Sequence, residues 1–123
     1  MSLEKADTLF SQGLYKEAQV EFTEHIKTLA KKGNKINPLI HYNMAQCNKE
    51  LKMFTAAVLS FKSALAGFME LKEAEMIQKT NFNIGLVFEQ QKRYAVAKIY
   101  FDEANKENER AEITEKIQEM DKL

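Results

Sequence analysis

The apolar residues of this chain recur at three- and four-residue steps, which is the spacing of one face of an α-helix. One cluster occurs three times: an aromatic residue, an alanine three positions on, a phenylalanine four positions further and, in two copies, another alanine. The central alanines, Ala18, Ala57 and Ala97, lie 39 and 40 residues apart. A period of this length predicts a helical repeat, in which each unit buries its apolar face only against its neighbours. The copies are Tyr15-Ala18-Phe22-His25, Phe54-Ala57-Phe61-Ala64 and Tyr94-Ala97-Phe101-Ala104.

This periodicity, together with the residues that start and stop helices, predicts seven helices. Gly13 and Gly33 permit the turns that end the first two, whereas Asn37-Pro38 suits the start of the third. Thr55 is expected to cap the fourth helix. No glycine or proline separates the fourth helix from the fifth, so the break near Lys72 is predicted from spacing alone. The approximate ranges are 2–12, 14–32, 38–51, 55–71, 73–91, 94–106 and 108–122.

Small residues stand where the two helices of each predicted pair must cross. Helices approach to ~8–10 Å only where the side chains at the crossing leave room. The first helices supply Ala6, Ala45 and Gly85, the second helices supply Ala18, Ala57 and Ala97, and the bulk beside them comes from Phe22, Phe61 and Phe101.

The composition fits a single, nearly all-helical domain. The chain has 123 residues, 45% of them hydrophobic, with one proline and four glycines. Its 18 basic and 18 acidic residues balance, which argues against a nucleic-acid partner, because such proteins carry a basic surface. No apolar run approaches the ~20 residues of a membrane span, and the N-terminus lacks the pattern of a secretory signal. The lone Cys47 cannot form an internal disulfide, so we expect a reducing, cytoplasmic location.

Residues that carry chemistry are few and scattered. His25, His41 and Cys47 do not stand three or four positions from one another, so no metal site is expected. The chain contains no phosphate-binding loop, no nucleophile elbow and no His-Glu helix motif. We therefore expect no enzymatic activity, no cofactor and no small-molecule substrate.

Through the residues of its repeats, the chain resembles the longer-period branch of the tetratricopeptide-repeat (TPR) family over essentially its whole length. The family places a small residue in the first helix of each repeat, an aromatic residue at the turn, and alanine, an aromatic residue and alanine in the second helix. The chain departs from this pattern at His25, where alanine is usual, and at Ser2, His41 and Asn81, where the family has tryptophan. The resemblance implies a single all-α domain, a right-handed α-solenoid of three antiparallel helix pairs. The repeats would span about 2–36, 37–72 and 73–107, followed by a capping helix at about 108–122.

The resemblance also implies a binding surface. In TPR proteins the first helices of the pairs line a concave groove that holds a peptide segment of a partner, although some groove aromatics could instead pack between repeats. A carboxylate clamp for acidic chaperone tails is not expected, because Asp7 would repel a carboxylate and only Asn43 and Lys79 match the clamp. The positions that correspond to the groove are Leu3, Asp7, Phe10, Tyr42, Gln46, Lys49, Lys79, Phe82, Leu86 and Glu89.

Two functions from different classes therefore compete. The first is a protein–protein interaction scaffold or adaptor that binds a peptide segment of a partner in the groove. The alternative is a self-assembling or chaperone-like module that acts through its outer helices or through the apolar stripe of Ile113 and Ile117. Such a module could form a homodimer. The chain could also be the regulatory end of a longer protein. The sequence leaves the identity of the partner open.

Overall fold

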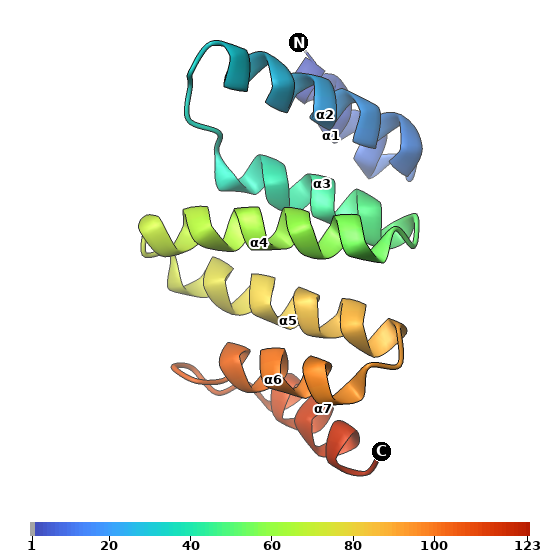
Figure 1. Ribbon diagram of the computed structural model, residues 1–123, viewed down its shortest axis with the longest axis vertical. Coiled ribbons are helices and arrows are strands. Elements are labelled where there is room, and N and C mark those ends of the chain that lie inside the picture. The colour runs from blue at the N-terminus through green and yellow to red at the C-terminus, as the bar shows by residue number, and fades with distance from the viewer. Residues whose placement is uncertain (1) are drawn as a thin grey trace. The chain divides into compact units, whose positions relative to one another are not determined.

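The computed structural model describes residues 2–123, and within that range the chain forms seven α-helices and no strand (Figure 1). The all-helical class predicted from the sequence is thus confirmed. None of the helices in this range is both long enough and apolar enough to cross a membrane. The helices are α1 (Ser2–Ser11), α2 (Tyr15–Lys31), α3 (Pro38–Glu50), α4 (Phe54–Glu70), α5 (Ala74–Gln90), α6 (Tyr94–Ala104) and α7 (Ala111–Asp121).

The start of one helix was predicted correctly and that of another was not. Asn37 caps α3 as expected, because its Oδ1 accepts a hydrogen bond from the Leu39 N–H at 3.0 Å. Thr55 does not cap α4, because that helix already begins at Phe54. The aromatic residue of the repeat is therefore the first helical residue rather than part of the turn.

The last helix begins at Ala111 rather than at residue 108. The Asn105 side chain explains this difference. Its Oδ1 accepts a hydrogen bond from the Arg110 N–H at 2.8 Å, and its Nδ2 donates to Thr114 Oγ1 at 2.9 Å. These two bonds hold the intervening residues as a loop.

Five helix ends share one turn geometry. The second residue after each helix adopts a left-handed backbone conformation. The N–H groups of this residue and of the one after it donate hydrogen bonds to carbonyl groups in the last turn of the helix. At the end of α4, the Lys72 N–H donates to the Met69 carbonyl at 3.1 Å and the Glu73 N–H to the Phe68 carbonyl at 3.0 Å. Glycine adopts this conformation without strain, whereas lysine does not. The φ angles are 77° at Gly13, 69° at Gly33, 59° at Lys52, 56° at Lys72 and 61° at Lys92.

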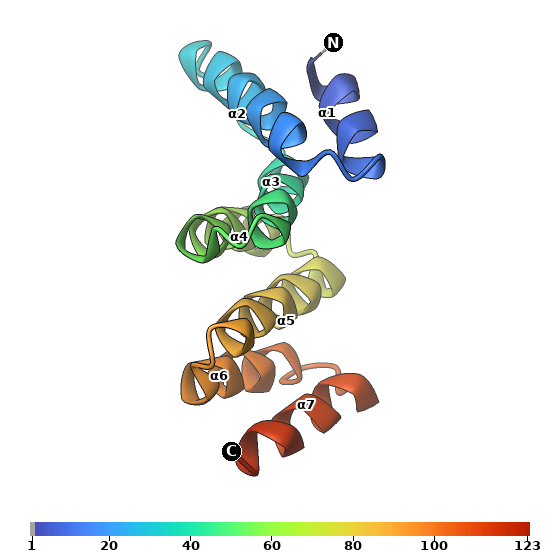
Figure 2. The same cartoon turned by 90° about the vertical axis from the view of Figure 1, so that its right-hand side faces the viewer.

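The helices fall into two compact units, Met1–Ala64 and Leu65–Leu123, divided within α4. In the first unit α1 pairs with α2 across a short turn (Figure 2), and α3 packs against α2. The buried cluster of this unit combines small and bulky side chains. Its members are Ala6, Ala18, Phe22, Ile40 and Cys47.

In the second unit α6 packs against both α5 and α7 (Figure 1). The closest crossing lies at Gly85, where an added Cβ would stand 2.5 Å from the ring of Phe101. Phe101 is fully buried, so its ring has little room to move and glycine is required. The other predicted crossing residues are confirmed as fully buried. These are Ala6, Ala18, Ala45, Ala57 and Ala97.

The helix α7 is held on α6 by apolar and polar contacts. Ile113 and Met120 are only 2% and 6% exposed. Lys98 of α6 forms an ion pair with Asp121, with Nζ 2.6 Å from Oδ1. The buried isoleucine and methionine supply most of the stabilisation, because exposed ion pairs contribute little.

Candidate functional site

The ten residues predicted to line a groove lie on α1, α3 and α5. On each helix they stand three or four positions apart, so they share one face of that helix. None is fully buried: Asp7 and Lys79 are exposed and the other eight are half-buried. Each of these helices therefore offers part of the predicted face to solvent.

The α1 face contributes mainly to packing. Leu3 and Phe10 lie against the core of the first unit. The Phe10 ring meets the Tyr15 ring edge-on, with centroids 5.6 Å apart. Asp7 is the one exposed member of this set, so a ligand here would meet a carboxylate between two largely covered apolar side chains.

The α3 face presents an aromatic ring held in a fixed orientation. The Tyr42 ring meets the buried Phe61 ring edge-on, with centroids 5.6 Å apart and an interplanar angle of 71°. One and two turns further along, Gln46 and Lys49 are half-buried. Burial lowers the pKa of Lys49, although the Glu50 carboxylate opposes this effect. A partly desolvated ammonium interacts more strongly with a ligand charge than one in open water.

The α5 face carries an equivalent aromatic pair. The centroids of Phe82 and Phe101 lie 5.5 Å apart, with the rings tilted by 46°. Tyr42 and Phe82 are 40 positions apart in the sequence, as are Phe61 and Phe101. In both units, therefore, a half-exposed ring on the first helix rests on a buried phenylalanine of the helix that follows.

The polar groups around Lys79 contact one another within α5. Lys79 pairs with Glu75 on the same helix, with Nζ 3.4 Å from Oε1. The Asn83 side chain donates to the Lys79 carbonyl at 2.9 Å, and Asp7 stands where the clamp needs an asparagine. The lack of a carboxylate clamp stays a prediction from the sequence.

Glu89, the last predicted groove residue, is already paired. Lys116 of α7 places its Nζ 3.1 Å from Glu89 Oε1 and 3.2 Å from Oε2. Partial burial opposes the charge on Lys116, but the hydrogen bond and charge of Glu89, together with Glu119, outweigh it and raise the pKa of Lys116. A ligand on α5 must therefore compete with Lys116 for this carboxylate. Lys116 could not be assigned to this face from the sequence, because no local pattern links residues on α5 and α7.

The titratable residues that could carry chemistry are isolated. Among the described residues, no group of three or more His, Cys, Asp or Glu side chains is placed to hold a metal ion. Cys47 is fully buried, and burial raises the pKa of its thiol to about 11. Burial likewise lowers the pKa of His41. A protonated, inaccessible thiol is chemically inert at neutral pH.

Known proteins share both a repeat and a fold with this chain. The family model described as tetratricopeptide repeat matches residues 78–110, which run from α5 into the loop after α6. No curated protein matches the sequence. Among solved structures, the N-terminal domain of stress-induced protein-1 (STI-1) from C. elegans is similar, with a TM-score of 0.83 and 20% sequence identity. The match covers 98% of this chain and 91% of that chain, and at this identity it shows a common fold.

Proposed function

Because residues 78–110 match the tetratricopeptide-repeat model and the chain shares its fold with the STI-1 domain, we propose that it is a tetratricopeptide-repeat protein, a protein–protein interaction module that binds a segment of a partner protein. The binding residues are those on the exposed faces of α1, α3 and α5. The chain acts by binding alone, as a scaffold or adaptor, without a catalytic step. The three repeats and the capping helix expected from the sequence are part of this proposal.

The observation that carries the proposal is the recurrence of one half-exposed ring in both units. Tyr42 and Phe82 are each oriented by a buried phenylalanine. A ring fixed in this way loses little conformational freedom when a ligand covers it, so its contacts contribute efficiently to affinity. Rigid aromatic residues of this kind are common among the residues that dominate binding energy.

The charged members of the set provide selectivity. Lys49 and Lys79 are the cations of α3 and α5, and Asp7 is the anion of α1. Glu89 is neutralised by Lys116. Lys79 is in turn paired with Glu75. An apolar or aromatic partner segment whose acidic residues lie beside Lys49, or displace Glu75 from Lys79, therefore fits better than a uniformly basic one.

A capture experiment tests the proposal. Tyr42→Ala combined with Phe82→Ala should abolish capture of partner proteins from the native host, because both anchoring rings are lost. Circular dichroism must show unchanged helix content, so that the loss is assigned to the surface.

The matched control is Leu59→Ala combined with Ile99→Ala. These residues also stand 40 positions apart in the sequence, and they are 63% and 64% exposed on α4 and α6. The control should capture as the unchanged protein does. If the ring variant still captured the partner and the control did not, the faces of α1, α3 and α5 would be ruled out as the binding site.

The same exposed aliphatic side chains support a second candidate, self-association through the outer helices. Val20 occupies the equivalent position on α2 and is 49% exposed. Light scattering should then show a dimer that Leu59→Glu with Ile99→Glu converts to a monomer. Self-association through the apolar stripe of α7 is less well supported. Ile113 is 2% exposed and packs inside the unit, so it is not accessible to a second copy.

A further inference from the structure

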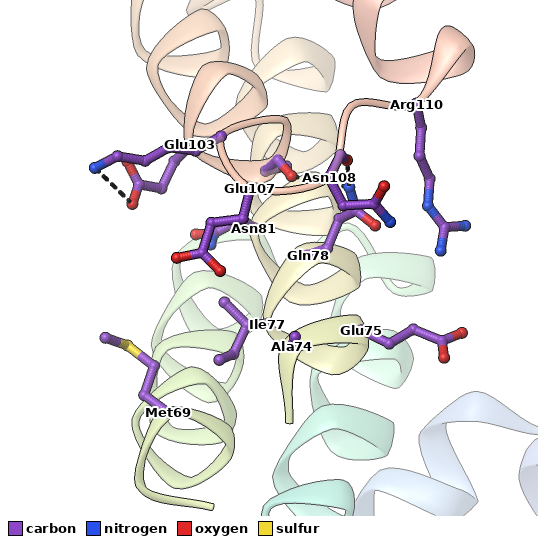
Figure 3. Close-up of a pocket in the computed structure, with 12 residues that line it drawn as sticks. Met69, Ala74, Glu75, Ile77, Gln78, Asn81, Glu103, Glu107, Asn108 and Arg110 are labelled. Atoms are coloured by element: carbon purple, nitrogen blue, oxygen red, sulfur yellow. Dashed lines mark hydrogen bonds and ion pairs between the residues drawn. The ribbon is translucent and has the colours of Figure 1, made fainter. Parts of the chain in front are cut away.

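The second unit contains a pocket that extends from Ile77 and Asn81 of α5 to Gln78, beside the face that carries Phe82 and Leu86. It has a volume of about 420 Å³ and lies where α4 and α6 end and α5 begins (Figure 3). Met69 of α4 and Ile77 of α5 form its apolar side, and Asn81 lies one helical turn further along α5. Its volume lies in the range of roughly 300–1,000 Å³ that is usual for ligand pockets.

Two hydrogen bonds from one side chain connect the walls of the pocket. The Gln78 side chain donates to the Ala104 carbonyl at 3.0 Å and also to the Asn108 carbonyl. Gln78 is 7% exposed, so these bonds connect α5 with the end of α6 and the following loop in a sheltered place. The pocket is therefore built into the unit rather than formed by a chance surface fold.

Asn81 is a polar side chain without a partner at this pocket. It is 4% exposed and lines the pocket, yet its amide makes no hydrogen bond to another described residue. No fully enclosed polar side-chain atom of the described residues lacks a partner, so the Asn81 amide keeps some access to solvent, and Asn81 lines the pocket. A nearly buried amide of this kind is costly unless a ligand or water bonds to it.

The mouth of the pocket is acidic on the side of Met69 and Ile77. Glu103 and Glu107 both line it, and Figure 3 shows them on that side, whereas Arg110 extends away from them. Glu103 is paired with Lys106, which also lines the pocket, with Nζ 4.0 Å from Oε1, and Glu107 forms no ion pair with another described residue. The C-terminal ends of α4 and α6 bring the negative ends of two helix dipoles to the pocket, against one positive end from the start of α5.

We propose that this pocket binds an arginine side chain of a partner polypeptide. The aliphatic stem of the arginine packs against Met69 and Ile77, and its guanidinium donates to Asn81 Oδ1 and to the Glu107 carboxylate. A planar guanidinium with five donors can satisfy an amide oxygen and a carboxylate together, which a lysine ammonium does less well. The site does not depend on the binding proposed for Tyr42 and Phe82.

The test is a titration of the full chain, labelled with ¹⁵N, with N-acetyl-arginine amide. The side-chain amide signals of Asn81 and the backbone signals of Ile77 and Glu107 should shift in a saturable way. N-acetyl-citrulline amide has the same shape without the charge, and it should bind about tenfold more weakly, since charge-assisted hydrogen bonds are the stronger ones. Added salt should lower the affinity for the arginine compound only, because its binding includes a partly exposed ion pair.

Variants assign the binding to the pocket. Glu107→Gln and Asn81→Leu should each lower the affinity for the arginine compound about tenfold. Glu112→Gln, which removes an exposed carboxylate of α7 outside the pocket, should leave binding unchanged. Equal binding of the citrulline compound, shifts confined to residues elsewhere, or the absence of saturable shifts would overturn the proposal. So would an effect of Glu112→Gln as large as that of Glu107→Gln.

Discussion

At the scale of single residues, three lysines adopt a backbone conformation that usually belongs to glycine. Lys52, Lys72 and Lys92 have φ angles of 59°, 56° and 61°. They terminate α3, α4 and α5 in the same way as Gly13 and Gly33 terminate the first two helices. A residue with a Cβ is strained here by about 1–2 kcal/mol, so the hydrogen bonds of the turn must outweigh this cost.

Replacement of one of these lysines by glycine should stabilise the protein. Lys72→Gly is expected to raise the free energy of unfolding by about 0.5–1 kcal/mol, because the strain is removed and the turn keeps its backbone bonds. The control is Lys62→Gly, an exposed position inside α4, which should lower the free energy of unfolding by about 1 kcal/mol. Urea denaturation measures both. Destabilisation of the same size at both positions would show that the turn conformation is not strained.

Gly85 illustrates the opposite situation, in which glycine is needed for space. Gly85→Ala should destabilise the protein by about 1–3 kcal/mol through overpacking against Phe101, even though alanine is the better helix former. The double variant Gly85→Ala with Phe101→Leu should lose less than the sum of the two single changes, since the smaller side chain makes room for the methyl group. Additive losses in thermal unfolding would contradict the close contact.

At the scale of helices, the sequence predicted elements better than their ends. Regular apolar spacing identified all seven helices, and local signals marked three boundaries: Gly13 and Gly33 the ends of α1 and α2, and Asn37-Pro38 the start of α3. The end of α4 could only be inferred from spacing, because Lys72 gives no local signal for a left-handed turn. The small residues at the crossings were predictable for a simple reason: each must repeat with the period of the fold.

Polar residues inside the units were not predictable. Gln78 bonds to the end of α6 and to the loop after it, and Asn48 receives a hydrogen bond from Gln19 of α2. In the candidate site, Glu89 is paired by Lys116. In each case the partner lies more than 25 positions away, so the interaction depends on how helices pack rather than on any local pattern.

The helix α7 supplies a prediction at this scale. Ile113→Ala should lower the free energy of unfolding by about 2–4 kcal/mol, because it leaves a cavity beneath α7. Lys98→Ala, which removes only an exposed ion pair, should have a much smaller effect. Hydrogen exchange should locate the loss from Ile113→Ala in α7 first, since the neighbouring α5 and α6 retain their own contact. Uniform loss of protection across the second unit would instead show that α7 does not open independently.

At the scale of the whole molecule, the fold and the candidate function rest on different kinds of observation. The helical-repeat fold follows from the periodic core, from the tetratricopeptide-repeat match over residues 78–110 and from the likeness to the STI-1 domain. The fold alone does not specify a partner, because function is determined by the residues displayed on it. The residues proposed for this role are the two oriented rings, the cations of α3 and α5, and the Asn81 pocket.

The most direct test of partner binding by the first helices is hydroxyl-radical footprinting with a captured partner segment. Oxidation of each side chain, measured by mass spectrometry, reports its access to solvent with and without the segment. The binding proposed for α1, α3 and α5 predicts that the segment suppresses oxidation of Tyr42 and Phe82 while Leu59 and Ile99 oxidise as before. Suppression at Leu59 and Ile99, with Tyr42 and Phe82 unchanged, would contradict it.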